Sequence, residues 1–491
     1  MKQRDLKRNA RRPSPKLLLY AGMTCLLFAA ASCSKSGGNN VSQAQRQVAN
    51  AVKPGNVSGT VKGTFLQDST YFVTGDIIVN KGDTIVFQPG AKIYITGNYN
   101  FWLHGNISSV GTKSDPVWFT VQNQQKFDNP SEDPLQDPAY KGLWGGFQGD
   151  STTSFMVFKY THIEFTGGIY GSAQTDGTVN GGYSPAIGAF NINGFLDVED
   201  CWFYGCIDGK AALAIEGGNY NVMRNIFEKV GIVGSECVVV NSGTTGNIAY
   251  NLMMGGCSNG IKVWSKGTTY QDSCVAYNNT ILNCGYRRYF YGGAGNSLGR
   301  GGSIDIEQNG KALIYNNLLV NDRVGLRVVG TGTYEGNALV VADTAHLYYG
   351  NNYNYSDSLV MADQIYPPGL LTKPMSTDIP SPSSYLPVGY ALGDNYDGTA
   401  VVGVGNPKFV NYSLPINLTA AGAYATLDRL AYVTGFDFHL ASGSPAIGKG
   451  TTSFSIAKTN IPMDPNFGAT AVTPPGADIG CYQSNGTGLG N

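Results

Sequence analysis

Short apolar runs recur along the middle of the chain, each interrupted by Asn. The pattern is seen in "VMRNIFEKVG" from Val222, "IAYNLMMGGC" from Ile248, "CVAYNNTILNCG" from Cys274 and "LIYNNLLVNDRVG" from Leu313. No long stretch repeats apolar residues at helical spacing. Only 14% of residues are charged, and Gly alone accounts for 66 of 491, a composition typical of strands and tight turns. The pattern therefore predicts an all-β chain.

The interrupting polar residues are regularly spaced. Asp200, Asn225, Asn251 and Asn278 are separated by 25, 26 and 27 residues, and Asn316 follows after 38. A period in the mid-twenties built from β-forming residues is typical of a solenoid. We expect Asn to occupy the same turn in successive coils. There its amide would donate and accept hydrogen bonds along the stack and tolerate a left-handed backbone.

A short alternating run follows each Asn motif: "AALAIEG", "CVVVNS", "GIKVWSK", "SIDIEQN" and "GLRVVG". Each coil should therefore hold at least two short strands, and stacked coils pair equivalent strands in parallel. The Leu-x-x-Leu-x-Leu skeleton of leucine-rich repeats is absent. The longer step of 38 residues contains "GYRRYFYGGAGNSLGRGG", which we interpret as a loop inserted at residues 285–302.

The chain resembles the right-handed parallel β-helix, or pectin-lyase-like, superfamily. The stretch "GDIIVNKGDTIVFQPGAKIYITGNYNFWLHGNISSVGTKSDPVWFT" is similar to the opening coils of such proteins, and "LWGGFQG" with "MVFKYTHIEFTGG" to the next coil. Near the end, "NPKFVN", "DFHLASGSPAIGKG" and "PPGADIGCYQ" resemble closing coils. The resemblance implies a right-handed parallel β-helix solenoid with coils of about 25 residues over 63–484, and irregular excursions at 345–434. A separate small domain at 345–434 is the alternative. This scaffold hosts lyases, hydrolases, adhesins and inert modules.

The N-terminal residues have the features of an export signal. "MKQRDLKRNARRPSPK" is basic, "LLLYAGMTCLLFAAAS" is apolar, and the ending "AASC" resembles a bacterial lipobox. We expect residues 1–32 to be a signal peptide, Cys33 to carry lipid, and 33–62 to be a flexible tether. A plain secretory signal is the alternative. The lipid would make this an outer-membrane lipoprotein of the bacterial cell envelope, periplasmic or surface-exposed.

Removal of residues 1–32 leaves an acidic protein. Seven Lys/Arg and one acid are lost, so 33 − 7 = 26 bases face 34 − 1 = 33 acids, a net charge near −7. This charge excludes general affinity for nucleic acid. We expect the protein to be a monomer and to contact a polysaccharide or oligosaccharide. Residues 485–491 should form a short C-terminal tail.

Three cysteines occupy the same phase of the repeat: Cys206, Cys257 and Cys284 each lie six residues after an Asp or Asn of the series. Cys257 and Cys284 should therefore lie one coil apart. Neighbouring coils are about 4.8 Å apart, within the reach of a disulfide. A disulfide and an inward stack of buried thiols are both open, and the spacing does not predict a metal cage.

The loop insertion and the strands beside it form the candidate site. Arg side chains bind carboxylate or sulfate, and aromatic rings stack on sugars. The insertion supplies Tyr286, Arg287, Arg288, Tyr289 and Arg300. Alternation in the strands, with Leu213, Ile215, Ile261, Val263, Ile304 and Ile306 inward, predicts that these residues point outward: Glu216, Lys262, Trp264, Asp305, Glu307 and Arg327.

A polysaccharide lyase neutralises a uronate carboxylate and abstracts the adjacent proton with a base. Lys262 or Arg287 could be the base, and Arg327 or Arg300 the neutralising group. Trp264 and the insertion residues would bind substrate. Asp305 and Glu307 would also bind substrate and could hold Ca²⁺, although no cofactor is required by the sequence. The alternative is a solvated sheet face with cross-strand ion pairs.

A glycoside hydrolase is the weaker enzyme hypothesis. A polygalacturonase-type pattern would need "DD" and a His-Gly motif in the helix core; no "DD" occurs, and the one "HG" is His104-Gly105. His162 has no other candidate catalytic residue near it in the sequence and lies in a strand-like alternation, so we expect it at the surface or at the edge of the core. The sequence thus leaves two hypotheses: a carbohydrate-contacting lipoprotein with lyase activity in question, and a non-catalytic scaffold or interaction module.

Overall fold

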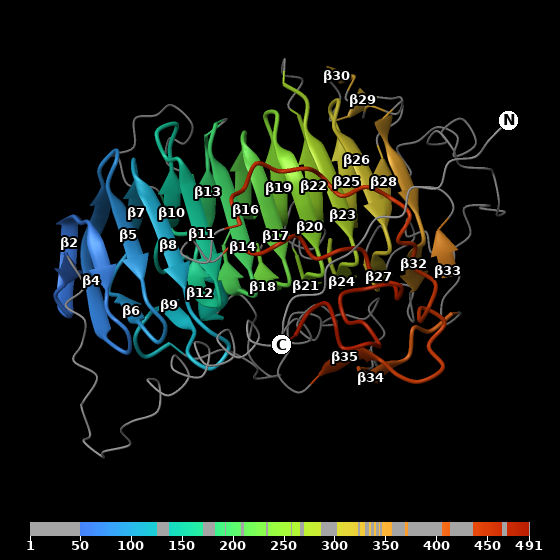
Figure 1. Ribbon diagram of the computed structural model, residues 1–491, viewed down its shortest axis with the longest axis horizontal. Coiled ribbons are helices and arrows are strands. Elements are labelled where there is room, and N and C mark those ends of the chain that lie inside the picture. The colour runs from blue at the N-terminus through green and yellow to red at the C-terminus, as the bar shows by residue number, and fades with distance from the viewer. Residues whose placement is uncertain are drawn as a thin grey trace, which may run out of the picture. The chain divides into compact units, whose positions relative to one another are not determined.

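A typical coil holds three short strands, and equivalent strands of successive coils pair in parallel. One coil shows the order: β14 (Phe195–Glu199), β15 (Trp202–Cys206) and β16 (Ala211–Glu216) follow one another around the axis. The next coil repeats it with β17 (Asn219–Met223) and β18 (Ile226–Val230). The computed structural model in Figure 1 is thus an all-β parallel β-helix, as predicted.

The structure describes most of the chain from residue 50 onward. The described residues are 50–124, 137–169, 182–191, 193–207, 211–231, 234–256, 258–265, 270–285, 302–322, 325–328, 346–355, 405–412, 436–463 and 469–490, with the short pieces 333–334, 338–339, 343 and 369–371.

The strands form three rows, which we call sheets A, B and C. Sheet A has eleven strands: β1 (Ala51–Val52), β3 (Gly63–Phe65), β5 (Thr84–Phe87), β8 (Asn106–Val110), β11 (Phe155–Lys159), β14, β17, β20 (Thr245–Ala249), β23 (Ser273–Tyr277), β26 (Lys311–Tyr315) and β31 (Tyr348–Gly350). Sheet B contains β6 (Lys92–Ile95), β9 (Val117–Thr120), β12 (Thr161–Thr166), β15, β18, β21 (Leu252–Met254), β24 (Thr280–Leu282), β27 (Leu318–Val320) and β32 (Asn352–Tyr355). Sheet C contains β7 (Asn100–Leu103), β10 (Gly146–Gly149), β13 (Ile187–Ala189), β16, β19 (Glu236–Asn241), β22 (Asn259–Trp264), β25 (Gly302–Glu307) and β28 (Leu326–Val328). Sheets B and C join at β2 (Gly55–Thr60) and the long β4 (Thr70–Val79).

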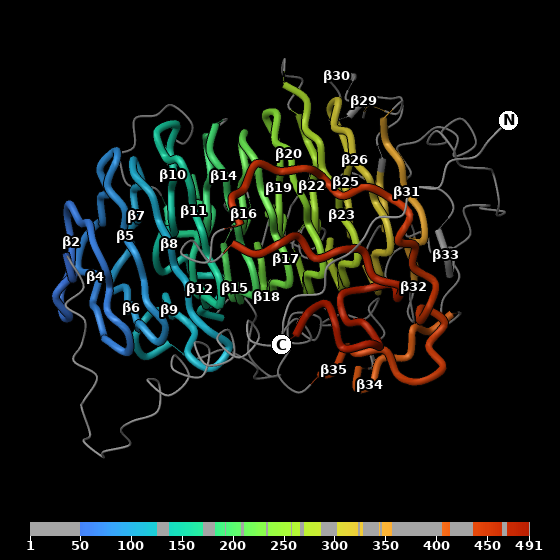
Figure 2. The backbone as a smooth tube through the Cα atoms, in the orientation of Figure 1, coloured from blue at the N-terminus to red at the C-terminus, as the bar shows by residue number. Residues whose placement is uncertain are grey.

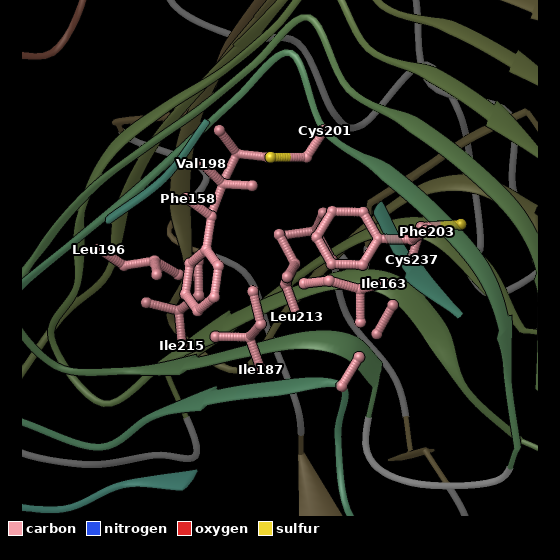
Figure 3. Close-up of a cluster of buried hydrophobic side chains, with 14 of the residues drawn as sticks. Phe158, Ile163, Ile187, Leu196, Val198, Cys201, Phe203, Leu213, Ile215 and Cys237 are labelled. Carbon is pink, nitrogen blue, oxygen red and sulfur yellow. The ribbon is translucent and has the colours of Figure 1, made fainter. Parts of the chain in front are cut away.

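Apolar side chains from all three sheets fill the interior. Figure 3 shows Leu196 of sheet A, Phe203 of sheet B, and Leu213 and Ile215 of sheet C within this core. All four are nearly inaccessible to solvent. Because β-strand side chains alternate between faces, the residues between them point away from the axis. The alternation predicted for sheet C is therefore confirmed.

A column of buried Asn side chains occupies the corner between sheets A and B. Each amide oxygen accepts the backbone N–H of the column residue one coil earlier, at 2.9–3.1 Å. Each amide nitrogen donates to the next oxygen, at 2.9–3.0 Å. The column, which we call the Asn ladder, consists of Asn225, Asn251, Asn279, Asn317 and Asn352, with Cys201 in the equivalent place before it. It provides partners for backbone groups that would otherwise be buried without them.

The sequence predicted that one Asn in each coil both stacks by hydrogen bonds and adopts the left-handed backbone, but the structure divides these roles between two neighbouring residues. The residue before each ladder position has the left-handed backbone, with φ of 55° at Asp200, 51° at Asn278 and 58° at Asn316. The sequence alignment joined these three to Asn225 and Asn251, which belong to the ladder. The predicted register was therefore wrong by one residue in three coils. In two of them, two consecutive Asn residues give no local sign of which one joins the ladder, and in the third Cys201 takes the ladder place.

A C-terminal strap, defined as residues 449–463 and 469–478, lies along the outer face of sheet A. Figure 2 shows it as a red tube that crosses the strands of this sheet twice. Corner residues with left-handed backbone hold it. Asn316 accepts the backbone N–H of Thr451 at 2.9 Å and donates to its carbonyl at 2.8 Å, and Asn278 accepts the N–H of Gly476 at 3.0 Å.

Segments predicted to be closing coils do not form coils. Instead, β34 (Phe409–Asn411) and β35 (Asp437–Leu440) pair in antiparallel fashion. A second apolar cluster joins this part of the chain to the outer surface of sheets A and B. Its C-terminal members are Phe438, Ala446, Ile479, Cys481, Tyr482 and Leu489, packed on residues that include Leu252, Met254 and Leu318. Leu489 lies in the predicted tail, so that tail is part of the fold.

Two further boundaries differ from the prediction. Strands β1 and β2 lie within residues 33–62, so the helix begins inside the predicted tether. Strands β31 and β32 lie within the predicted excursion 345–434 and continue the stack, because Asn352 extends the ladder. Beyond them, β33 (Gly369–Leu371) pairs antiparallel with β32. A small antiparallel pair, β29 (Thr333–Tyr334) and β30 (Ala338–Leu339), and a short 3-10 helix, η2 (Pro138–Tyr140), complete the described elements.

The cysteines of the described residues are free and buried. Cys284 lies in the central core, where burial raises the pKa of its thiol. Its predicted neighbour Cys257 falls outside the described residues. The inward position predicted for Cys284 is therefore confirmed, and its thiol is not in a disulfide.

Truncation of a single side chain of the Asn ladder should strongly reduce the stability of the protein. In Asn251→Ala, the backbone N–H and the side chain of Asn225 lose their acceptor, which lies 2.9 and 3.0 Å away. We expect the free energy of unfolding to fall by about 3 kcal/mol, because buried donors are left without partners. Urea unfolding would measure it. Asn193→Ala, at an exposed position, is the control and should change stability by less than about 0.5 kcal/mol; equal effects would contradict the structural role.

Candidate functional site

The predicted strip lies on the outer face of sheet C, over β22, β25 and β28. Ile261 and Val263 point into the core, and Lys262 and Trp264 between and after them point outward. Parallel register then sets the neighbours. Lys262 lies beside Asp305, and Asp305 lies beside Arg327. Two residues further along the strands, Trp264 lies beside Glu307.

The charged side chains of the strip pair across the strands, both directly and diagonally. Lys262 Nζ is 2.7 Å from Glu307 Oε1. Arg327 Nη1 is 2.9 Å from both oxygens of Asp305 and 3.6 Å from Glu307 Oε2. Two cations and two carboxylates therefore neutralise one another. This is the cross-strand ion pairing that the sequence offered as the alternative to a catalytic site.

These charges are on the outer face but are shielded from solvent. Lys262 is 8% exposed, Asp305 and Arg327 are 2% exposed, and Glu307 is 1% exposed. Trp264 is half-buried, and Lys262 Nζ lies 4.7 Å from the centre of its ring. The ion pairs hold this ammonium beneath the indole, in the range of a cation–π contact. The ring is thus the solvent-facing member of the strip.

Burial raises the pKa of Asp305 to about 6, against the opposing pull of the Arg327 guanidinium. Nearby Glu307 raises this pKa further, and Lys262 lowers it. Desolvation outweighs the ion pair because the carboxyl group is removed from water. A carboxyl group with such a pKa can exchange a proton near neutral pH.

Two polar contacts extend the strip beyond the predicted residues. Asn259 Nδ2 donates to Glu236 Oε1, and Asn241 Nδ2 donates to Glu216 Oε1, both at 3.4 Å. Glu236 was not selected from the sequence. The signal was available, because Glu236 begins the run "ECVVVN", which occupies the same phase of the repeat as "NGIKVW".

Several predicted site residues fall outside the described residues. They are Cys33 and the insertion residues Tyr286, Arg287, Arg288, Tyr289 and Arg300. Their lipidation, catalytic and binding roles stay predictions. The structure brings together Lys262, Trp264, Asp305, Glu307 and Arg327, which the sequence placed on one strip.

The strip does not fit Ca²⁺. The carboxylates of Asp305 and Glu307 face the cations of Arg327 and Lys262 at 2.7–2.9 Å, so their charge is already engaged. Among the described residues, no group of three or more His, Cys, Asp or Glu side chains is arranged to hold a metal ion. Within the same part of the chain, no helix has the length and apolar character needed to cross a membrane.

Comparisons with known proteins gave no match: no family model fits the chain, and searches of curated proteins and of solved structures found no significant similarity. The assignment to the parallel β-helix fold therefore rests on strand pairing and the ladder. The site must be judged from its own chemistry.

The raised pKa of Asp305 predicts a pH dependence of stability. An unfolded Asp titrates near 4, so the contribution of this group is fully present below about pH 4 and is lost as pH rises through about 6. We expect the unfolding free energy of the native protein, relative to Asp305→Asn, to decline between about pH 4 and pH 6. Urea unfolding at stepped pH would measure the difference. A difference that stays constant, or rises, over this range would contradict the predicted direction.

Proposed function

We propose that this protein is an envelope-anchored β-helix lipoprotein that contacts complex carbohydrate through the outer face of sheet C. The observation that carries the proposal is the half-buried Trp264 indole, fixed over Lys262 by a network of ion pairs. A rigid aromatic ring with polar groups around it suits the apolar face and hydroxyl groups of a sugar. Membership of the pectin-lyase-like superfamily and anchoring through lipid on Cys33 are parts of the same proposal.

The use of the other faces supports this choice. The C-terminal strap hydrogen-bonds along sheet A, and the second apolar cluster packs on sheets A and B. These contacts lie on two sides of coils whose third side carries the strip. Sheet C therefore offers a rigid face in this region of the helix, and rigid elements are good supports for binding sites.

Lyase activity at the strip is the second candidate. The raised pKa of Asp305 favours it, because shifted carboxyl groups gather at catalytic sites. The ion pairs of Lys262 and Arg327 count against either side chain as the base or the neutralising group, since both would first have to leave a buried carboxylate. Binding without catalysis is therefore the better-supported function.

Removal of the indole should weaken carbohydrate binding. For Trp264→Ala we expect about a tenfold loss of affinity, which corresponds to about 1.4 kcal/mol, because the stacking surface is lost. Isothermal titration with a panel of neutral and uronic-acid oligosaccharides would measure it. Tyr183→Ala, which removes another aromatic ring that is 39% exposed, is the control. Unchanged affinity in the Trp264 variant would remove sheet C from the site.

An activity screen separates binding from catalysis. Incubation with uronic-acid polysaccharides, with ultraviolet absorbance followed for unsaturated products and an assay for reducing ends, reports lyase and hydrolase reactions respectively. We expect binding without either product. Growth of absorbance that is abolished by Asp305→Asn would instead favour the lyase.

A further inference from the structure

A second line of residues lies on the outer face of sheet B. It combines three aromatic rings with one lysine, whereas the strip combines one aromatic ring with paired charges. Consecutive strands β6, β9, β12 and β15 place Lys92 beside Trp118, Trp118 beside His162, and His162 beside Trp202. Neighbouring strands are about 4.8 Å apart, so the four residues form a line about 14 Å long, parallel to the helix axis. We call it the aromatic line.

The three rings of the aromatic line pack against one another. The centres of Trp118 and His162 are 3.9 Å apart with an interplanar angle of 26°, and those of His162 and Trp202 are 5.1 Å apart at 52°. Trp202 Nε1 donates to Glu228 Oε2 at 2.7 Å. All three side chains are half-buried. The rings therefore form a fixed ridge, and the face of Trp118 opposite His162 is turned toward the strand of Lys92.

Lys92 differs from the cations of sheet C. It is exposed, and no ion pair of its ammonium group is found within the described residues. Lys262 and Arg327, in contrast, are buried against carboxylates. A solvated, unpaired ammonium can approach an anionic ligand without breaking an existing ion pair.

The nearby acids are turned to other partners. Glu164 and Glu228 lie in the adjacent column of sheet B and are 6% and 0% exposed. Glu164 accepts a hydrogen bond from Thr120 at 2.8 Å, and Glu228 accepts one from Trp202. Their charge is shielded by burial on one side of the line, whereas Lys92 projects into solvent at its end.

The fold limits the line at the other end. Beyond Trp202, the same column of sheet B continues as Ile226 and Leu252, which belong to the second apolar cluster covered by C-terminal residues. Trp202 itself packs against that cluster. The column thus changes from aromatic and cationic to aliphatic where the covering segment begins.

We propose that the aromatic line binds an acidic polysaccharide, one bearing uronate or sulfate groups, at its Lys92 end. A sugar stacks on the face of Trp118 opposite His162, and its anionic group pairs with Lys92. This inference rests on the proposed carbohydrate-contacting function and names a substrate class and a second contact surface for it. On a mature chain of net charge near −7, such a local cation is what an acidic ligand requires.

Charge reversal at the end of the line tests the proposal. The full-length protein is titrated with oligogalacturonate, a sulfated dextran and an uncharged cello-oligosaccharide at low and high salt, with tryptophan fluorescence and calorimetry as readouts. For Lys92→Glu we expect at least a tenfold loss of affinity for both charged chains at low salt, a smaller loss at high salt, and no change for the neutral chain. The matched control is Lys81→Glu, at another exposed lysine in the turn between β4 and β5.

Removal of the ring completes the test. Trp118→Ala should lower affinity for the charged chains at both salt concentrations, because stacking is not screened by salt. Equal effects of Lys92→Glu and Lys81→Glu would overturn the aromatic line as the site. Loss of acidic-glycan binding only in Trp264→Ala would leave the proposed function standing and refute this inference. No binding of any glycan by the wild-type protein would refute both.

Discussion

The whole structure depends on one constraint: the backbone groups that turn each coil at the corner of sheets A and B are buried and need partners. The Asn ladder meets this need from coil to coil, because each amide accepts the N–H of the coil before it and donates to the amide after it. Loss of one of these Asn side chains leaves a buried N–H donor without an acceptor. In the coils from β14 to β32, the ladder fixes this corner and so helps to set which side chains of the adjoining strands point outward.

The residue before each ladder position performs a second task on the outside of the same corner. Its left-handed backbone turns the chain, and where it is Asn its side chain is free to bind the C-terminal strap. Asn278 and Asn316 bond Gly476 and Thr451 in this way, although about 200 and 135 residues separate the partners. Two successive Asn residues thus join the interior stack to the outer cover.

Burial separates the charged groups of the two candidate surfaces. On sheet C, Lys262 and Arg327 are enclosed with Glu307 and Asp305, and desolvation raises the pKa of Asp305 to about 6. Charges in such a network position Trp264 more readily than they reach a ligand. On sheet B, Lys92 remains in solvent beside a ridge of rings. A helix with several faces can in this way keep structural ion pairs and ligand-facing cations apart.

The amino-acid sequence by itself determined the coil period, the parallel pairing and the outward strip of Lys262, Trp264 and Asp305, because alternation and repeat length are local properties of the chain. It could not determine which of two adjacent Asn residues joins the ladder, nor that "DFHLASGSPAIGKG" packs on the outside instead of forming a coil. It also left His162 isolated, although the fold stacks it between Trp118 and Trp202, which lie 44 and 40 residues away. These outcomes were decided by tertiary structure, because burial and cross-coil contacts join residues whose separation along the chain carries no local signal.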